Sequence, residues 1–235
     1  MKTLTNLKTV AKPTFLLVIL SITLFGCLKK LDEVPQASIS GLSLIHASPT
    51  VEKFDIYLNQ TKVNSTDFSF TNKIDYVNAY SGNRQVSLAN KNASGFRKSE
   101  SFTLKPQAAY SLFVIGKIDD IGFLFLNDTL TNPPVGKAKI RFVNLSPDAG
   151  ALNLAIDGAT ADLVIDKLFK ESSTFKIVDK AERVTFNIKN KTTGAIETTL
   201  TNVKIEDGKI YTLWVKGLKA VNDDFKLGAS IYTHK

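Results

Sequence analysis

A repeat with an offset of 98 residues most strongly limits how this chain can fold. Residues 42–49 (Leu-Ser-Leu-Ile-His-Ala-Ser-Pro) align without a gap on residues 140–147 (Ile-Arg-Phe-Val-Asn-Leu-Ser-Pro). The same offset relates further apolar pairs: Phe54 and Leu152, Ile56 and Leu154, Leu58 and Ile156, Val86 and Val184, and Leu88 and Phe186. Three extra residues in the second copy then bring Tyr110 and Phe113 onto Tyr211 and Trp214. This agreement predicts two copies of one domain, each long enough for its own core.

Apolar and polar residues alternate within nearly every segment of both copies, as in residues 54–58 and 184–188. A period of two is that of a half-buried strand. About seven short strands per copy are separated by Ser-Pro, Ser-Gly-Asn and Asp-Gly turn signals, and only residues 163–170 suit as much as one helical turn. The pattern predicts an all-β fold of two tandem, immunoglobulin-like antiparallel β-sandwiches.

The segment between the copies, residues 127–134 (Asn-Asp-Thr-Leu-Thr-Asn-Pro-Pro), is rich in turn-forming residues. Its paired prolines favour an extended, semi-rigid spacer. We therefore expect a first domain at residues 37–126, a linker at 127–134 and a second domain at 135–235.

The N-terminus combines a basic start with a short apolar run, residues 15–25. The run is too short for a bilayer, which takes roughly 20 residues, so residues 1–26 read as a secretory signal. Residues 24–27 (Leu-Phe-Gly-Cys) resemble the lipobox of bacterial lipoproteins, which are cut before the cysteine. The resemblance implies a mature chain held to a membrane by acyl chains, palmitate among them, at Cys27, with residues 27–36 as its tether.

The residues after Cys27 bear on location. Leu28 stands where an aspartate would resemble an inner-membrane retention signal, so we expect a lipid anchor in the outer membrane. Residues 29–33 (Lys-Lys-Leu-Asp-Glu) loosely resemble a surface-export signal, which leaves the periplasmic and the surface-exposed face both open. Cys27 is the only cysteine, so the mature chain holds no internal disulfide.

The charge of the chain does not favour a nucleic-acid partner. The formal net charge of +8 falls to +5 when Lys2, Lys8 and Lys12 leave with the signal. The remaining lysines are spread along the chain, whereas a nucleic-acid site gathers them on one face. We therefore expect no nucleic-acid partner.

One family is similar to the opening of the second copy. Residues 140–149 (Ile-Arg-Phe-Val-Asn-Leu-Ser-Pro-Asp-Ala) and 152–158 (Leu-Asn-Leu-Ala-Ile-Asp-Gly) resemble the domain-of-unknown-function family 4397, found in bacterial exported proteins. The first copy is a weaker match, with His46 and Thr50 in place of Asn144 and Asp148. The resemblance implies β-rich envelope modules, often in tandem, and no established reaction.

Few residues suit catalysis. His46 beside Ser48 could form a base and nucleophile pair, but a serine before proline in both copies is better explained as a turn residue. His234, the other histidine, lies one residue from the chain end. We expect no catalytic residue.

Metal and cofactor sites are equally poorly marked. No Cys or His cluster has zinc spacing, and no glycine-rich phosphate loop is present, so we expect no cofactor and no metal. The acidic pairs Asp119-Asp120 and Asp223-Asp224 precede the last strand of each copy and are candidate oxygen ligands for a hard cation, with solvated acids as the alternative.

Four aromatic side chains are candidates for contact with a ligand: Tyr76, Tyr80, Phe96 and Trp214. Trp214, the sole tryptophan, is out of phase with its apolar neighbours, which predicts a position on the outward face of its sheet. Packing in the core or between the domains is the favoured role for this ring, and contact with a ligand is the alternative. Thr129 follows Asp128 and precedes Leu130, a pattern that resembles an O-glycosylation acceptor of exported proteins.

These observations predict a non-catalytic, lipid-anchored envelope protein that acts as a binding, adhesion or structural module. One alternative is a glycan-binding accessory lipoprotein, and another is a hydrolase that uses His46. The partner, protein or glycan, is not specified by the strand pattern, because the loops of a sandwich carry its function.

Overall fold

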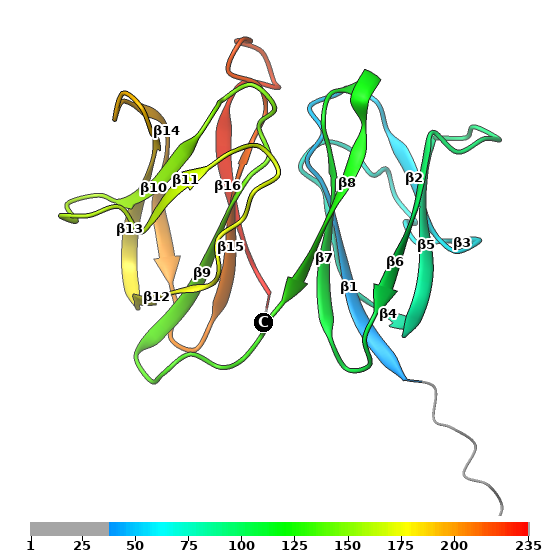
Figure 1. Ribbon diagram of the computed structural model, residues 1–235, viewed down its shortest axis with the longest axis horizontal. Helices are drawn as coiled ribbons and strands as arrows, with labels where there is room; N and C mark the ends of the chain where they lie inside the picture. Colours follow the sequence, from blue (N-terminus) through cyan, green and yellow to red (C-terminus); the bar gives the residue numbers. More distant parts are fainter. Residues whose placement is uncertain (1–37, 235) are drawn as a thin grey trace, which may run out of the picture. The chain divides into compact units, whose positions relative to one another are not determined.

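The computed structural model describes residues 38–234, which form strands joined by loops (Figure 1). The strands of the first copy are β1 (Ile39–His46), β2 (Phe54–Leu58), β3 (Thr61–Lys62), β4 (Lys73–Tyr80), β5 (Gly82–Asn90), β6 (Lys98–Leu104), β7 (Ala109–Ile115) and β8 (Gly122–Asp128). Those of the second are β9 (Lys137–Asn144), β10 (Leu152–Ile156), β11 (Val164–Lys167), β12 (Lys176–Asp179), β13 (Ala181–Asn190), β14 (Ile196–Ile205), β15 (Ile210–Lys216) and β16 (Gly228–Thr233). The 3₁₀ helix η2 (Ile118–Asp120) precedes β8.

The predicted signal peptide, Cys27 and most of the predicted tether lie outside the described residues. Within residues 38–234 we find no helix with the length and apolar character needed to cross a membrane. Residues 37–235 belong to one compact unit.

Each copy forms a β-sandwich of two four-stranded sheets, which confirms the predicted all-β tandem fold. The first sandwich has sheets of order β4-β1-β7-β8 and β3-β2-β5-β6. The second repeats this order eight strands later, as β12-β9-β15-β16 and β11-β10-β13-β14. Each sandwich thus has eight strands where about seven were predicted. In the second sandwich, β11 occupies the segment predicted as a helical turn, and its counterpart in the first is the two-residue strand β3. The antiparallel prediction also has one exception per copy, since β1 pairs parallel to β7 and β9 parallel to β15.

The pairing register tests the repeat residue by residue. Leu42 lies opposite Tyr110 in the first sandwich and Ile140 opposite Tyr211 in the second, as the alignment predicts. The alignment is wrong at β5 and β13. Ile56 lies opposite Leu88, whereas its counterpart Leu154 lies opposite Ile188 and not Phe186. A slip of two residues leaves every side chain on the same face of a strand, so alternation alone conceals it.

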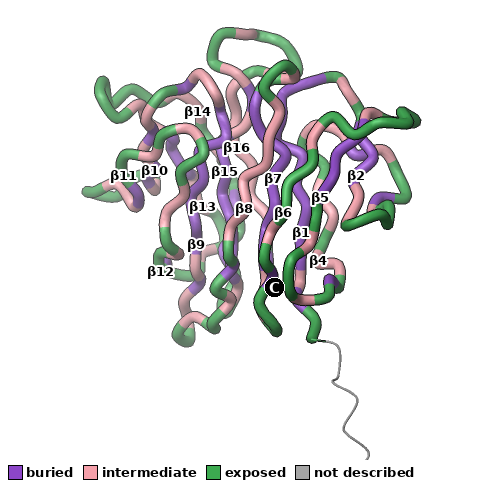
Figure 2. The backbone as a smooth tube through the Cα atoms, turned by 45° about the vertical axis from the view of Figure 1, so that its right-hand side comes forward, coloured by how far each residue is buried: buried purple, intermediate pink, exposed green. Residues whose placement is uncertain are grey.

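Each sandwich encloses its own apolar core. In the first, Leu44, Ile56 and Leu88 face inward and are completely buried, and the second has its equivalent cluster around Phe142 and Leu154. Buried segments follow the paired strands, while exposed residues gather in the loops (Figure 2). Each such aliphatic side chain contributes about 1.5–3 kcal/mol of burial free energy, so no disulfide is needed to hold either core.

A third apolar cluster, the seam, joins the outward faces of the sheets that contain β1 and β9. The first sandwich contributes Ile45, Ala47, Phe113 and Ile115, and the second contributes Val143, Leu145 and Trp214. Val143, Leu145 and Trp214 are the repeat equivalents of Ile45, Ala47 and Phe113. The two copies therefore meet through the same face of each.

Trp214 lies on the outward side of its sheet, as its phase predicts. This side is covered by the seam, where the indole ring is only 2% exposed and lies 6.4 Å from the Phe113 ring. Trp214 therefore packs between the domains, the role that the sequence favoured, and its ring is not exposed to a ligand.

The Asn-Leu-Ser-Pro-Asp motif holds strand ends and loops together. The Asn144 side chain donates to the Gly150 and Lys167 carbonyls, and its oxygen accepts the Ser146 backbone N–H. Asp148 accepts the backbone N–H groups of Lys219 and Ala220. Desolvation raises the pKa of this half-buried carboxyl, but the hydrogen bonds together outweigh it and lower the pKa below its usual value. The motif that carries the family resemblance is therefore structural in the second copy.

Candidate functional site

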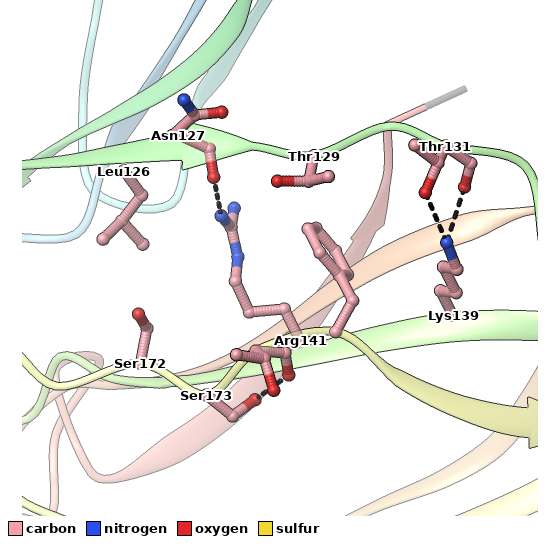
Figure 3. Close-up of a pocket in the computed structure, with 10 residues that line it drawn as sticks. Leu126, Asn127, Thr129, Thr131, Lys139, Arg141, Ser172 and Ser173 are labelled. Atoms are coloured by element: carbon pink, nitrogen blue, oxygen red, sulfur yellow. Dashed lines mark hydrogen bonds between the residues drawn. The ribbon is translucent and has the colours of Figure 1, made fainter.

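An open pocket of about 470 Å³ lies where the two sandwiches adjoin (Figure 3). Its walls come from three segments: the end of β8 with the connection that follows it, β9, and the loop before β12. The lining residues are Leu126, Asn127, Thr129, Thr131, Lys139, Arg141, Ser172, Ser173, Thr174 and Phe175.

A second open pocket, of about 450 Å³, shares the segment Ser172, Ser173 and Thr174 with the first. Its other lining residues are Asp162, Leu163, Val164, Ile165, Lys167 and Lys176. We refer to the two adjoining pockets together as the junction groove.

Most of the residues that line the groove carry hydroxyl, amide or basic groups, and apolar side chains supply the rest of its surface. Lys139 Nζ donates to the carbonyl and the hydroxyl of Thr131, at 2.8 and 2.7 Å, and Arg141 Nη1 donates to the Asn127 carbonyl at 3.2 Å (Figure 3). The hydroxyls of Ser172 and Thr174 have no hydrogen-bond partner within residues 38–234. These groups are thus available to a ligand with hydroxyl groups of its own.

Arg141 is also part of a buried network beneath the groove. Its Nη2 lies 2.7 Å from Asp128 Oδ1, a buried ion pair, although the angle between the two groups is too poor for a hydrogen bond. The other carboxylate oxygen accepts the hydroxyls of Ser111, at 2.7 Å, and Tyr76, at 2.6 Å. The guanidinium also lies over the Phe175 ring, 4.9 Å from its centroid. The floor of the groove is therefore fixed by contacts from both sandwiches.

His234 completes the network, although it lies one residue from the chain end. Its Nε2 lies 2.7 Å from the Thr212 hydroxyl and its Nδ1 lies 2.6 Å from the Tyr76 hydroxyl. Burial lowers the pKa of His234 to about 4, so the ring is neutral at pH 7. Because Tyr76 donates its own proton to Asp128, Nδ1 carries the imidazole proton and Nε2 accepts from Thr212.

Tyr76 and Asp128 both have positions in this network that differ from those predicted from the sequence. Tyr76 was expected as a ligand-contacting ring, but its hydroxyl is committed to Asp128 and His234, and burial beside that carboxylate raises the pKa of the phenol. Asp128 was expected in the linker, but it ends β8 and is buried. The connection between the last strand of one copy and the first strand of the next is residues 129–136. An acid at a strand end carries no local signal that it will be buried.

Tyr80 and Phe96 have exposed rings, at 63% and 54%, but they belong to the first sandwich away from the groove. Tyr80 lines a separate pocket of about 350 Å³ with Asn59, Asn78 and Arg84. The Arg84 guanidinium there donates to three backbone carbonyls of the β4–β5 turn. Phe96 packs edge-on against Tyr57 at 5.4 Å. The two exposed candidates are therefore not brought together with each other.

The acidic pairs are not gathered into a metal centre. Asp119 and Asp120 are exposed on η2, and Asp223 accepts the backbone N–H of Phe225 at 2.8 Å within its own loop. Within residues 38–234, no three His, Cys, Asp or Glu side chains cluster in a way that could hold an ion. A local turn accounts for Asp223 without a cation.

His46 and Ser48 do not form a catalytic pair. The His46 ring is fully buried, stacked on Phe54 at 5.1 Å and near Phe68 at 5.3 Å, and neither of its nitrogens has a hydrogen-bond partner. This burial lowers its pKa to about 4. Ser48 instead donates to the Gly116 carbonyl at 2.6 Å. The hydrolase interpretation loses its only geometric basis.

Thr129 is exposed and lines the groove, so its side chain is accessible to a modifying enzyme. Sequence reasoning missed the groove as a site. Two signals were present: Arg141 interrupts an otherwise apolar strand, and residues 172–174 are a run of hydroxyl residues. Neither signal says that the two segments meet.

The fold and groove define a tandem β-sandwich protein with an open polar site at its seam. The model of the family DUF4397, a domain of unknown function, matches residues 40–155. This match confirms the predicted resemblance, and it spans the first sandwich and the opening strands of the second. No curated protein matches the chain.

Solved structures offer distant likenesses only. One is the family 26 carbohydrate-binding module CBMbc of Amy13K from Eubacterium rectale, in complex with maltoheptaose, with 11% identity, a TM-score of 0.27, and coverage of 82% of this chain and 96% of that one. Another concerns α-glucan binding by a streptococcal virulence factor, with 11% identity, a TM-score of 0.26, and coverage of 83% and 96%. At these TM-scores the likeness carries no argument about this chain.

Proposed function

We propose that the protein is a non-catalytic binding module that holds a glycan in the junction groove. The observation that carries this proposal is the lining of the groove, in which hydroxyl, amide and basic groups surround the apolar side chains of Leu126 and Phe175. A sugar presents the complementary surface, with hydroxyls at its edge and C–H groups on its faces.

The groove is suited to binding rather than to a reaction. Its lining holds one carboxylate, Asp162, and neither histidine. A hydrolytic site needs a base with a nucleophile, or a second carboxylate across the bond that breaks. Hydrogen bonds from Ser172, Thr174 and Asn127 orient a ligand without such a step.

The position of the groove also favours a ligand site. Ligand pockets often lie between domains, where two rigid walls meet. Here the wall from the first sandwich is tied to Arg141 of the second through Asn127 and Asp128. A ligand therefore meets preformed walls, which reduces the entropy cost of binding.

The lipid anchor completes the proposal. Acylation of Cys27 would hold the sandwiches at the outer membrane through the residue 27–36 tether, as the lipobox resemblance implies. Glycan capture at an envelope surface would then need no catalytic group.

A protein partner is the second candidate. Ile165, Leu168 and Ile177 are exposed apolar residues in or beside the edge strands β11 and β12. Exposed edge strands can pair with another chain. A partner strand there would make the protein an interaction or adhesion module.

Binding of a glycan array by the purified mature chain tests the two candidates. Removing both free hydroxyls in Ser172→Ala/Thr174→Ala is expected to weaken glycan binding about tenfold, because each hydrogen bond contributes about 0.5–1.5 kcal/mol. Tyr80→Ala, which alters the separate pocket, is the control and is expected to bind normally. Loss of binding in Tyr80→Ala alone would refute the groove as the site. Ile177→Lys, which changes the exposed edge strand β12 outside the groove lining, tests for a protein partner.

A further inference from the structure

We propose that the glycan held in the junction groove is acidic, carrying carboxylate groups such as those of uronic acids. This inference rests on the proposed function and adds the chemical class of the ligand. It comes from the charges along the groove, where four basic side chains, Lys139, Arg141, Lys167 and Lys176, face one acid, Asp162.

The single acid of the groove is already neutralised. Asp162 Oδ1 accepts Lys189 Nζ at 2.9 Å, and Oδ2 accepts the Asn153 amide at 2.8 Å. The Lys189 contact holds the pKa of this carboxyl below its usual range. Lys189 is not part of the lining, so Asp162 compensates none of the four basic groups of the groove.

The basic groups differ in how they are paired. Arg141 is balanced by Asp128, whereas Lys139 donates only to the neutral groups of Thr131. Lys167 and Lys176 form no salt bridge within residues 38–234. Three lysines thus remain free to contact an anion.

Two other acids close to the groove in sequence are paired with lysines. Asp166, beside Lys167, pairs with Lys191 at 2.5 Å. Asp179, at the end of β12, pairs with Lys137 at 2.5 Å. Glu171 keeps its negative charge, because it accepts only the neutral Leu168 backbone N–H, at 2.8 Å. The three lysines outnumber this one acid, so the net free charge around the groove is positive.

The arrangement suits several carboxylates better than one. Lys139 lies in the first half of the groove, and Lys167 and Lys176 lie in the second, with the hydroxyls of residues 172–174 between them. A chain of sugars with repeated carboxylates can contact a lysine in each half and the hydroxyls between. An exposed ion pair strengthens binding about two- to fivefold, so three give a preference of about tenfold or more over a neutral chain.

Matched ligands test this inference directly. Uronic acid oligosaccharides of several linkages are compared with the same oligosaccharides after reduction of each carboxylate to a primary alcohol, by calorimetry at 50 mM salt. The expected result is binding at least tenfold tighter for an acidic member, with a preference that shrinks at 500 mM salt because exposed charges are screened.

Two double variants with the same net charge test whether the preference for an acidic ligand comes from the groove lysines. Lys167→Gln/Lys176→Gln is expected to weaken binding of the acidic oligosaccharide at least fourfold and to leave the reduced one unchanged. Lys105→Gln/Lys226→Gln removes the same net charge from exposed positions outside the groove lining, and is expected to bind as the wild type.

The possible outcomes distinguish a failure of the acidic-ligand inference from a failure of the proposed glycan-binding function. Equal or tighter binding of the reduced oligosaccharides, sensitive to Ser172→Ala/Thr174→Ala, would overturn the acidic class and keep a glycan site. Binding of neither class would overturn both. An equal loss in the two lysine pairs would show attraction by net charge and overturn the groove assignment.

Discussion

Lowering the pH from 6.5 to 4.5 is expected to destabilise the protein through its two buried histidines. His46 is fully buried between Phe54 and Phe68, and burial lowers its pKa from 6.5 to about 4. The unfolded chain therefore binds a proton in this range that the folded chain refuses, so stability falls as the pH falls. With 1.36 kcal/mol per pKa unit, the loss is about 2 kcal/mol for His46 over this interval.

His234, with the same lowered pKa of about 4, adds a loss of similar size. The wild type is thus expected to lose about 4 kcal/mol, and His46→Phe about half of that. Urea denaturation followed by circular dichroism, repeated at several pH values from 6.5 to 4.5, gives the slope of the free energy of unfolding against pH. Carboxyl groups with a lowered pKa, such as Asp67 at about 2, contribute little, because the unfolded carboxyl binds protons mainly near its ordinary pKa of 3.8, below this interval.

The absolute stability of His46→Phe at pH 7 is not the test, because filling the site with a larger ring and removing two unpartnered nitrogens have opposite effects. The slope against pH is the test, and His46→Leu repeats it with a smaller side chain. If both variants kept the full wild-type slope, a buried neutral His46 would be ruled out.

Three further perturbations follow from the structure. Arg141→Leu is expected to lower the free energy of unfolding by about 3–5 kcal/mol, since it leaves the Asp128 carboxylate buried and unpaired, while the double change with Asp128→Leu recovers much of the loss in urea denaturation; no recovery would contradict the ion pair. Gly217→Ala places a Cβ 2.3 Å from a backbone oxygen and is expected to cost at least 2 kcal/mol in the same assay, against about 1–2 kcal/mol for the unhindered Gly158→Ala. Cys27→Ala is expected to abolish incorporation of an alkyne-tagged fatty acid and to release the protein from the membrane fraction; retained label would refute lipidation at this residue.

The fold was largely predictable because its signals are local. Alternation sets which residues face a core, and a repeat of nearly 100 residues carries that pattern twice. The sequence alignment missed that Leu88 corresponds to Ile188 and not to Phe186, because a shift of two residues leaves each side chain on the same face of its strand. The alternation of residues predicts on which side of the sheet Trp214 lies, but it does not predict whether that side is exposed to solvent or buried against the other domain.

The groove was harder to foresee for a physical reason. Its walls join residues 126–131, two residues of β9 and a loop near residue 173, and no spacing in the chain links them. His234 and Asp128 look like terminal and linker residues in the sequence, yet they occupy equivalent positions at the ends of the last strands and meet at the seam. Polar groups become buried together only when two surfaces close over them.

The use of the same face by both copies has a consequence for how the protein behaves on dilution. Two separate chains with this face would form a symmetric dimer and would separate at low concentration. Here the connection at residues 129–136 holds the faces together at an effective concentration on the order of millimolar. A groove built across that contact therefore stays assembled in a single molecule, however few molecules a surface carries.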